Sequence, residues 1–508
     1  MKKTLMAVIL ITLAAKTIGF LREILLAYYY GATGVSDAYM ISLTIPTVIF
    51  ALIGTGIKTV FIPIYSSILS DQGKEAADAF TRKVLNLMIV ISSVVSLVVL
   101  LFTRPLVTLF ASGFEGETLS LAVTLTQISV FSVYFIGLEY VLQSYLQING
   151  RIAITAIVSL PMNLFVILSF PLSYHFGFRF LAIGKIVAVA SQVVFLIPSL
   201  KRCGLRISFD FRFKDHNMKR LMYLILPVVL GSSVNQINKL VDRTLASRIV
   251  IGGISALNYA SRLNLFVKEV FILSITTILY PSISRLAANK EFESFKRSFS
   301  ESITGVMFFV IPVSVATMTF SSEVVSLLYG RGSFDETASQ LTSGVLLFYS
   351  LGMLPVGLRE ILSRVFYSLH DTKTPMKNAA IGLITNIILN FVLSYYMGLE
   401  GLALATSISA SITMLLLALA LRKKIGQFGI QKLLFSFLKL LLVSIIVCSI
   451  CRVITEIILG VVGLELTMMI SLILGAVLYF GMTYFAKIDD VDAVFKQIRK
   501  HLTARKSN

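Results

Sequence analysis

The stretch VLNLMIVISSVVSLVVLLF, residues 84–102, decides the class of fold. It carries no charge and is long enough to cross the roughly 30 Å of hydrocarbon in a bilayer as a helix. Similar stretches recur along the chain, for example at 303–320, 433–451 and 468–485. A membrane β-barrel would show strands with alternating apolar and polar residues, and these stretches are apolar throughout. Because backbone groups in lipid must be hydrogen-bonded within their own segment, the pattern predicts an all-α, polytopic membrane protein.

The composition and the placement of charge support this class. Hydrophobic residues make up 56% of the chain and charged residues 14%, whereas soluble proteins carry about 25% charged residues. The formal net charge is +19, and Lys and Arg gather in alternate loops, at 201–220, 422–432 and in the tail at 496–506. The loops at 31–36, 250–254 and 398–401 contain none. This positive-inside pattern predicts an even number of spans with both termini in the cytoplasm, and it explains the basic charge without a nucleic-acid partner.

Apolar segments and turn signals together predict about fourteen membrane-spanning helices. The spans are expected at 4–30, 37–68, 84–103, 121–147, 152–174, 180–200, 219–249, 255–287, 298–320, 339–368, 376–397, 400–421, 433–459 and 466–486.

An internal repeat divides these helices into two groups. The sequence Leu-Ser-Tyr at 172–174 recurs at 393–395, and the residues that follow the two copies match at the same offset of 221. The repeat predicts two pseudo-symmetric six-helix lobes, followed by two further helices. The expected boundaries are an N-lobe at 1–203, a cytoplasmic loop at 204–218, a C-lobe at 219–424, and helices 13 and 14 with a basic cytoplasmic tail at 425–508. Transporters built from such repeats bind their substrate where the repeats meet.

Charged residues inside a span are costly in lipid, so each one is a candidate for function. The first helix contains Lys16, Arg22 and Glu23, and Asp37 begins the second. One interpretation is a cationic wall that faces a central cavity; the other is a structural pair of Arg22 with Glu23 or Asp37. Lys58, further along the second helix, either reaches the same cavity or extends to the cytoplasmic interface.

The seventh helix carries a second polar group. Asn235, Asn238 and Asp242 follow at positions i, i+3 and i+7 and therefore share one face. Lys239 and Arg243 flank that face. Such a helix must face water or the interior of a bundle, although a packing pair of Asp242 with either cation is the alternative.

Arg262 in the eighth helix has no acidic residue within four positions. An anionic ligand is the simplest partner for it, and a guanidinium group suits pyrophosphate because it can donate two hydrogen bonds at once.

Asn386 and Asn390 lie one turn apart in the eleventh helix, and Thr406 lies in the twelfth. With Asp242 they offer oxygen ligands of the kind that hard cations prefer, so they form a candidate site for a monovalent cation. The alternative is hydrogen bonding between helices.

No enzymatic constellation is found. The four histidines, at 175, 216, 370 and 501, lie far apart, the three cysteines show no metal-ligand spacing, and no phosphate-binding loop is present. We therefore expect a transporter without a resident cofactor, and its energy should come from an ion gradient or the membrane potential.

Six motifs carry a resemblance to a known family. They are GFLRE at 19–23, SDAY at 36–39, FIP at 61–63, YASRL at 259–263, LYPS at 279–282 and FYSLHDTKTP at 366–375. The chain resembles the MurJ/MviN family of lipid II flippases, within the multidrug, oligosaccharidyl-lipid and polysaccharide exporter superfamily. The resemblance extends over essentially the whole chain.

The resemblance implies a monomeric protein of the bacterial inner membrane. It implies that the protein moves undecaprenyl-pyrophosphate-linked peptidoglycan precursor from the cytoplasmic to the outer leaflet by alternating access, with cell-wall synthesis proteins as partners. Arg22 and Arg262 match cavity arginines of the family, Lys16 stands where many relatives have arginine, and Asp37 matches the family's helix 2 aspartate. A sodium site of some members would fall on Asp242, Asn386, Asn390 and Thr406.

One departure keeps other functions open. Many relatives carry a basic pair and an acidic residue along helix 2, where this chain has only Lys58. A flippase for another polyprenyl-linked oligosaccharide, of capsule or teichoic acid type, is therefore the main alternative. A cation-coupled drug exporter fits less well because the expected cavity is itself cationic, and a non-transporting scaffold would tolerate loss of Arg22 and Arg262.

Overall fold

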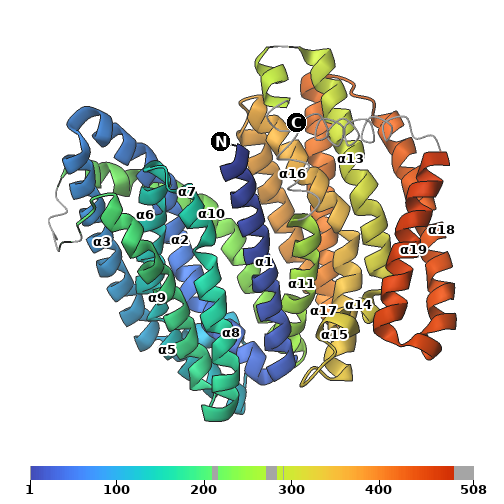
Figure 1. The fold of residues 1–508 in the computed structure, drawn as a ribbon, viewed down its shortest axis with the longest axis horizontal. Coiled ribbons are helices and arrows are strands. Elements are labelled where there is room, and N and C mark those ends of the chain that lie inside the picture. Colours follow the sequence, from blue (N-terminus) through green and yellow to red (C-terminus); the bar gives the residue numbers. More distant parts are fainter. Residues whose placement is uncertain (1, 207, 209–214, 270–282, 290, 486–508) are drawn as a thin grey trace. The chain divides into compact units, whose positions relative to one another are not determined.

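Helices account for all regular structure in the part of the chain that the computed structural model describes, residues 2–206, 208, 215–269, 283–289 and 291–485 (Figure 1). The prediction of an all-α membrane protein is confirmed. The chain divides into two compact units, Met1–Ser255 with Arg331–Asp335, and Ala256–Gly330 with Glu336–Asn508.

Ten helices lie within the first unit, and α11 (Gly253–Val267) begins at its end. They are α1 (Lys2–Tyr30), α2 (Gly34–Gln72), α3 (Lys74–Leu101), α4 (Thr103–Phe110), α5 (Gly116–Ser129), α6 (Ser132–Ile148), α7 (Ile152–Ile157), α8 (Ser159–Phe176), α9 (Arg179–Arg202) and α10 (His216–Ile249).

The second unit contains most of α11 and the helices that follow. They are α13 (Phe292–Thr319), α14 (Ser321–Tyr329), α15 (Glu336–Leu351), α16 (Met353–Ser368), α17 (Lys373–Ile425), α18 (Ile430–Val462) and α19 (Leu464–Phe485). Helix α10, which the sequence repeat assigns to the C-lobe, packs against α2 and so groups with the first unit. The lobe boundaries drawn from the repeat stay a prediction.

Among the described residues, seven helices are long and apolar enough to cross a membrane, or up to nine if each bent pair is one span. The pairs are α5 with α6, bent by 45°, and α15 with α16, bent by 43°. They coincide with the predicted spans 121–147 and 339–368. Helix α17 covers two predicted spans, 376–397 and 400–421. It is broken between them at Gly398, whose φ of 60° only glycine adopts readily. The total of fourteen spans stays a prediction.

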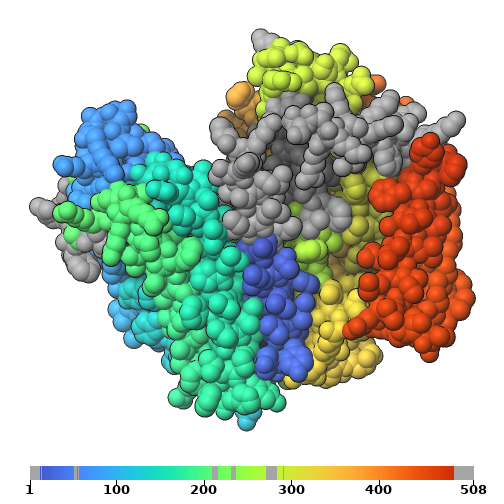
Figure 2. Space-filling view, in the orientation of Figure 1, coloured from blue at the N-terminus to red at the C-terminus, as the bar shows by residue number. Residues whose placement is uncertain are grey.

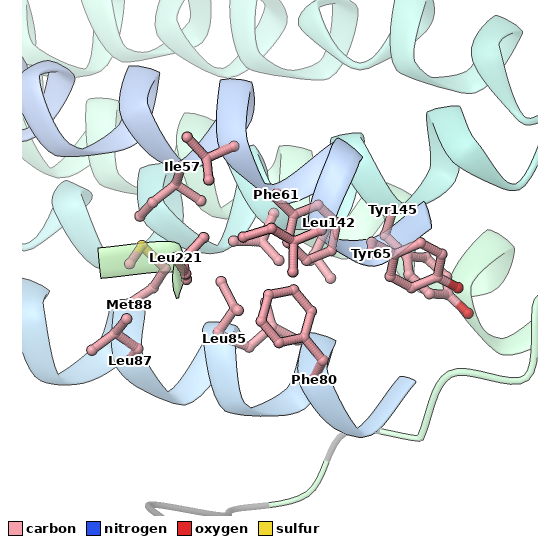
Figure 3. Packing of buried hydrophobic residues seen from close by; sticks show 14 of the residues in the cluster. Ile57, Phe61, Tyr65, Phe80, Leu85, Leu87, Met88, Leu142, Tyr145 and Leu221 are labelled. Carbon is pink, nitrogen blue, oxygen red and sulfur yellow. The ribbon is translucent and has the colours of Figure 1, made fainter. Parts of the chain in front are cut away.

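The core of the first unit is an aromatic and aliphatic cluster between α2, α3 and α6 (Figure 3). Ile57, Phe61 and Tyr65 recur every four residues and therefore share one face of α2. Phe61 stacks on Phe80 of α3 with ring centroids 5.8 Å apart, and Tyr65 meets Tyr145 of α6 edge-on at 5.6 Å. In a membrane such packing stabilises through van der Waals contact, because lipid is as apolar as the side chains.

The two helices that follow the predicted repeat, α18 and α19, are joined to other helices of the second unit by polar contacts. Tyr479 of α19 donates a hydrogen bond of 2.7 Å to the Phe308 carbonyl in α13, and Arg452 of α18 forms an ion pair with Glu323 of α14. Figure 2 shows the pair (red) as one continuous surface, and many of its exposed side chains, such as Leu472, are apolar. This surface is suited to contact with lipid.

Candidate substrate-binding site

Arg22 is held inside the first unit by two partners. Its guanidinium donates to Glu23 Oε1 at 2.6 Å and to Asn163 Oδ1, on α8, at 3.1 Å. The Arg22 side chain is 20% exposed and that of Glu23 only 6%. The Arg22–Glu23 pair that the sequence offered as one alternative is therefore formed. A five-donor guanidinium still has capacity for a further anion, so the pair and a binding role are compatible.

Glu139 and Lys185 were not among the residues singled out from the sequence. Glu139 lies on α6 and interacts electrostatically with Lys185 of α9 and with Lys58 of α2. Lys185 interacts in turn with Arg22, Glu139 and Glu23. The signal was available, because both residues lie within the predicted spans 121–147 and 180–200, where any ionisable residue is a functional candidate.

Lys16 and Lys58 are both partly buried. Lys16 lies on α1 ahead of Arg22. Lys58 interacts electrostatically with Glu139, and the choice between the cavity and the cytoplasmic interface stays a prediction.

Asp37 is almost completely buried and is fully occupied by backbone and hydroxyl donors. The Gly252 amide donates to its Oδ2 at 2.8 Å, and the Ser255 amide donates to its Oδ1 at 2.7 Å. The Ser255 hydroxyl donates to Oδ1 as well. A carboxylate at this place satisfies the free amides at the start of α11 and complements the positive end of the helix dipole. Asp37 therefore links α2 to α11, and a direct role in binding substrate stays a prediction.

On α10 the predicted polar stripe separates into residues with different surroundings. Arg243 donates to the Met40 carbonyl at 3.0 Å and also to the Thr44 hydroxyl, so it fastens α10 to α2. Asp242 is partly buried and Lys239 is exposed. The Asn238 Oδ1 atom is buried and accepts no hydrogen bond among the described residues. The side chain of Asn235 lies outside the described residues.

Arg262 lies in α11 and belongs to the second unit, where it is partly buried. Two residues on, Asn264 donates to the Tyr349 carbonyl at 3.3 Å and fixes this part of α11 to α15. Helix α11 thus begins in the first unit, where Asp37 accepts hydrogen bonds from its first turn, and its residues from Ala256 onward belong to the second unit.

Asn386, Asn390 and Thr406 lie together in the second unit. Asn386 donates to Thr406 Oγ1 at 3.4 Å, and Asn390 donates to Asn386 Oδ1 at 3.2 Å. These bonds fit the alternative of interhelical hydrogen bonding, and the same amide and hydroxyl oxygens suit a sodium ion. Asp242, the fourth predicted ligand, belongs to the first unit. A sodium site stays a prediction.

Comparison with known proteins gives one consistent result. The family model described as lipid II flippase MurJ matches residues 26–475. A probable lipid II flippase MurJ of Buchnera aphidicola subsp. Baizongia pistaciae is 31% identical over 82% of both chains. The lipid II flippase MurJ of Burkholderia cenocepacia is 26% identical over 81% of this chain and 82% of its own length.

Solved structures agree. The structure of lipid II flippase MurJ in an inward closed conformation superposes with a TM-score of 0.82 at 26% identity, over 95% of this chain and 99% of that one. An inward-facing multidrug transporter of the MATE family, in the MOP superfamily, gives a TM-score of 0.67 at 15% identity over 83% of this chain and 98% of its own, which shows a shared fold. With its multiple apolar helices and these relatives, the chain is a multi-pass inner-membrane protein of the lipid II flippase MurJ family.

Proposed function

We propose that this protein moves lipid II, the polyprenyl-diphosphate-linked peptidoglycan precursor, from the cytoplasmic to the outer leaflet of the inner membrane. The family match over residues 26–475 supports the substrate class. The observation that carries the proposal is Arg22, a partly exposed guanidinium held by Glu23 and Asn163 within the predicted span 4–30.

The chemistry of the cargo explains why such a residue is needed. The diphosphate cannot enter hydrocarbon without its charge being neutralised, whereas the apolar polyprenyl tail is soluble in the bilayer. Arginine binds phosphate oxygens with two parallel hydrogen bonds. Arg22 would bind the head group while the tail stays in the bilayer, and the family resemblance assigns Arg262 to cargo binding as well.

Transport also requires that the cargo leave. Glu23 shares the Arg22 guanidinium and competes with the phosphate for it, so binding stays moderate and reversible. Alternation of the two units would carry the head group across. An ion gradient or the membrane potential would supply the energy, because no nucleotide-binding motif is present in the sequence.

The experiment that tests this function is complementation of a bacterial strain depleted of its own lipid II flippase. We expect growth with the wild-type protein and lysis with Arg22→Ala and with Arg262→Ala, each present in the membrane at wild-type abundance. If the wild-type protein inserts into the membrane but does not rescue growth, the cargo would instead be assigned as another polyprenyl-linked glycan. Rescue by both variants would refute the role of the arginines.

A further inference from the structure

Two lysines inside predicted spans of the first unit make no close contact with a carboxylate among the described residues. Lys185 of α9 and Lys58 of α2 are both partly buried. Neither takes part in a hydrogen bond, or in an ion pair within 4.0 Å, with any residue that the structure describes. An ammonium group has three donors and no acceptor, so both groups retain donors for a ligand.

A single carboxylate lies near both lysines. Glu139 of α6 interacts electrostatically with Lys185 and with Lys58, and it accepts a hydrogen bond of 2.7 Å from Gln143 one turn further on. Lys185 also interacts with Arg22 and Glu23. We call Arg22, Glu23, Lys58, Glu139 and Lys185 the charge cluster; it joins α1, α2, α6 and α9.

The charges of this cluster do not balance. Three cations and two carboxylates leave one net positive charge, 3 − 2 = +1. Excess positive charge inside a membrane protein is unfavourable until an anion binds. The ligand that completes the cluster is therefore an anion with several oxygens, able to contact cations that come from separate helices.

Close helix packing fixes the position of Lys185. At the preceding residue, Gly184, α9 approaches α8 so closely that a Cβ atom would lie 2.1 Å from Ser169 Cβ. The backbone that carries Lys185 is thereby held against α8, the helix whose Asn163 also bonds Arg22. The helix α8 thus contacts both Arg22 and the backbone next to Lys185.

We propose that Lys185 and Lys58 bind the diphosphate of the lipid-linked cargo together with Arg22. Glu139 positions the two ammonium groups and lowers their affinity for the diphosphate. The inference rests on the proposed function and names further binding residues for it. Lysine acts on phosphate as a point charge and arginine as a two-pronged donor, so the cluster combines electrostatic attraction with orientation.

The test measures binding of undecaprenyl diphosphate to the purified full-length protein, with undecaprenyl monophosphate and phosphatidylglycerol as competing anionic lipids. Lys185→Met, which keeps the length of the side chain, should weaken diphosphate binding by about tenfold or more, the value of one charge-assisted hydrogen bond. Lys185→Arg should restore it. Lys201→Ala removes an exposed lysine on the same helix and should leave binding unchanged. Equal affinity of wild type and Lys185→Met, or equal binding of phosphatidylglycerol, would overturn the proposal.

Glu139→Gln gives an independent test with the opposite sign. Removal of the carboxylate raises the net charge of the cluster, so diphosphate binding should become tighter and growth support in the depleted strain should fall. If Glu139 had a structural role alone, Glu139→Gln would lower both the affinity for diphosphate and the thermal stability of the protein. Unchanged or weaker binding in a variant of wild-type thermal stability would therefore contradict the proposal.

The two levels can fail separately. If the wild-type protein does not rescue the depleted strain but Lys185→Met still weakens diphosphate binding, the cargo is another polyprenyl diphosphate and the cluster stands. If the wild type rescues and Lys185→Met binds and rescues equally well, lipid II transport stands and the cluster is wrong.

Discussion

At the scale of single residues, the charges within the spans have two kinds of surroundings. Asp37 is saturated by donors of Gly252 and Ser255, at the start of α11. Arg22 has two partners and remains partly exposed, and Lys185 has none within hydrogen-bonding distance among the described residues. Saturated charges hold helices together, whereas charges with remaining donors are available to a ligand.

Asp37 should therefore matter for stability as well as for transport. Asp37→Ala leaves the buried amides of Gly252 and Ser255 without an acceptor, which costs about 1–3 kcal/mol. The thermal unfolding midpoint of the purified protein should fall clearly. Asp71→Ala, at the exposed end of the same helix, is the control and should have little effect. Equal midpoints for the two variants would show that Asp37 does not cap α11.

At the scale of helices, close approach is set by small residues. Gly184 lies where α9 meets α8 at Ser169, with no space for a side chain. Small residues at such crossings are the usual basis of helix association in membranes.

A methyl group at Gly184 should separate the two helices. Gly184→Ala would force movement of α8 or α9 at an expected cost of about 1–3 kcal/mol, seen as a lower midpoint of thermal unfolding. Gly481→Ala in α19 is a matched control, because a Cβ there has no atom within 4 Å. A neutral Gly184→Ala would mean that the α8–α9 contact adapts freely.

The turn between α16 and α17 is fastened by Asp371. Its Oδ1 accepts from the Thr374 amide at 3.0 Å, and its Oδ2 accepts from Lys424, at the far end of α17, at 2.7 Å. Lys424 and the Thr374 donors lower the pKa of Asp371 from 3.8 to about 2. The turn thus ties the start of α17 to its end, across the break at Gly398.

This lowered pKa predicts a dependence on pH. A carboxylate with a lower pKa in the folded state stabilises it above the unfolded-state pKa near 4, and this stabilisation is lost as the pH falls from about 4 to 2. Asp371→Asn should lower the unfolding midpoint at pH 6 by the equivalent of less than about 1 kcal/mol, since the ion pair is partly exposed. The difference between variant and wild type should shrink as the pH approaches 2. A difference that is constant with pH would exclude ionisation of Asp371 as its cause.

At the scale of the whole molecule, the distribution of charge predicts orientation. Basic loops at 201–220 and 422–432 and the basic tail predict that both termini lie in the cytoplasm. A fluorescent protein fused after residue 508 should fluoresce, and alkaline phosphatase at the same place should be inactive. Fusion after Gly252, within a loop without Lys or Arg, should reverse both results. An active phosphatase at residue 508 would refute the cytoplasmic placement of the C-terminus.

The class of fold could be read from the sequence because lipid leaves few choices. Apolar stretches such as 84–102 must be helices where no water can satisfy the backbone, and the six motifs together suggested the family. The break at Gly398 falls between the predicted spans 376–397 and 400–421. The bends within the spans 121–147 and 339–368 were less accessible, because they depend on how neighbouring helices pack.

The sequence by itself determined that the chain crosses the membrane as helices, which residues carry charge into the spans, and the family that the motifs indicate. Hydrophobicity and spacing are local properties, so a one-dimensional pattern contains them. Only the tertiary structure decided which charges have partners. It showed that Asp37 accepts hydrogen bonds at the start of α11 and that Arg22 pairs with Glu23 and Asn163. It also brought Glu139 and Lys185, which lie 46 residues apart in the sequence (185 − 139 = 46), into one cluster. Partnership depends on distance in space, and helices far apart in the sequence establish that distance only when they pack.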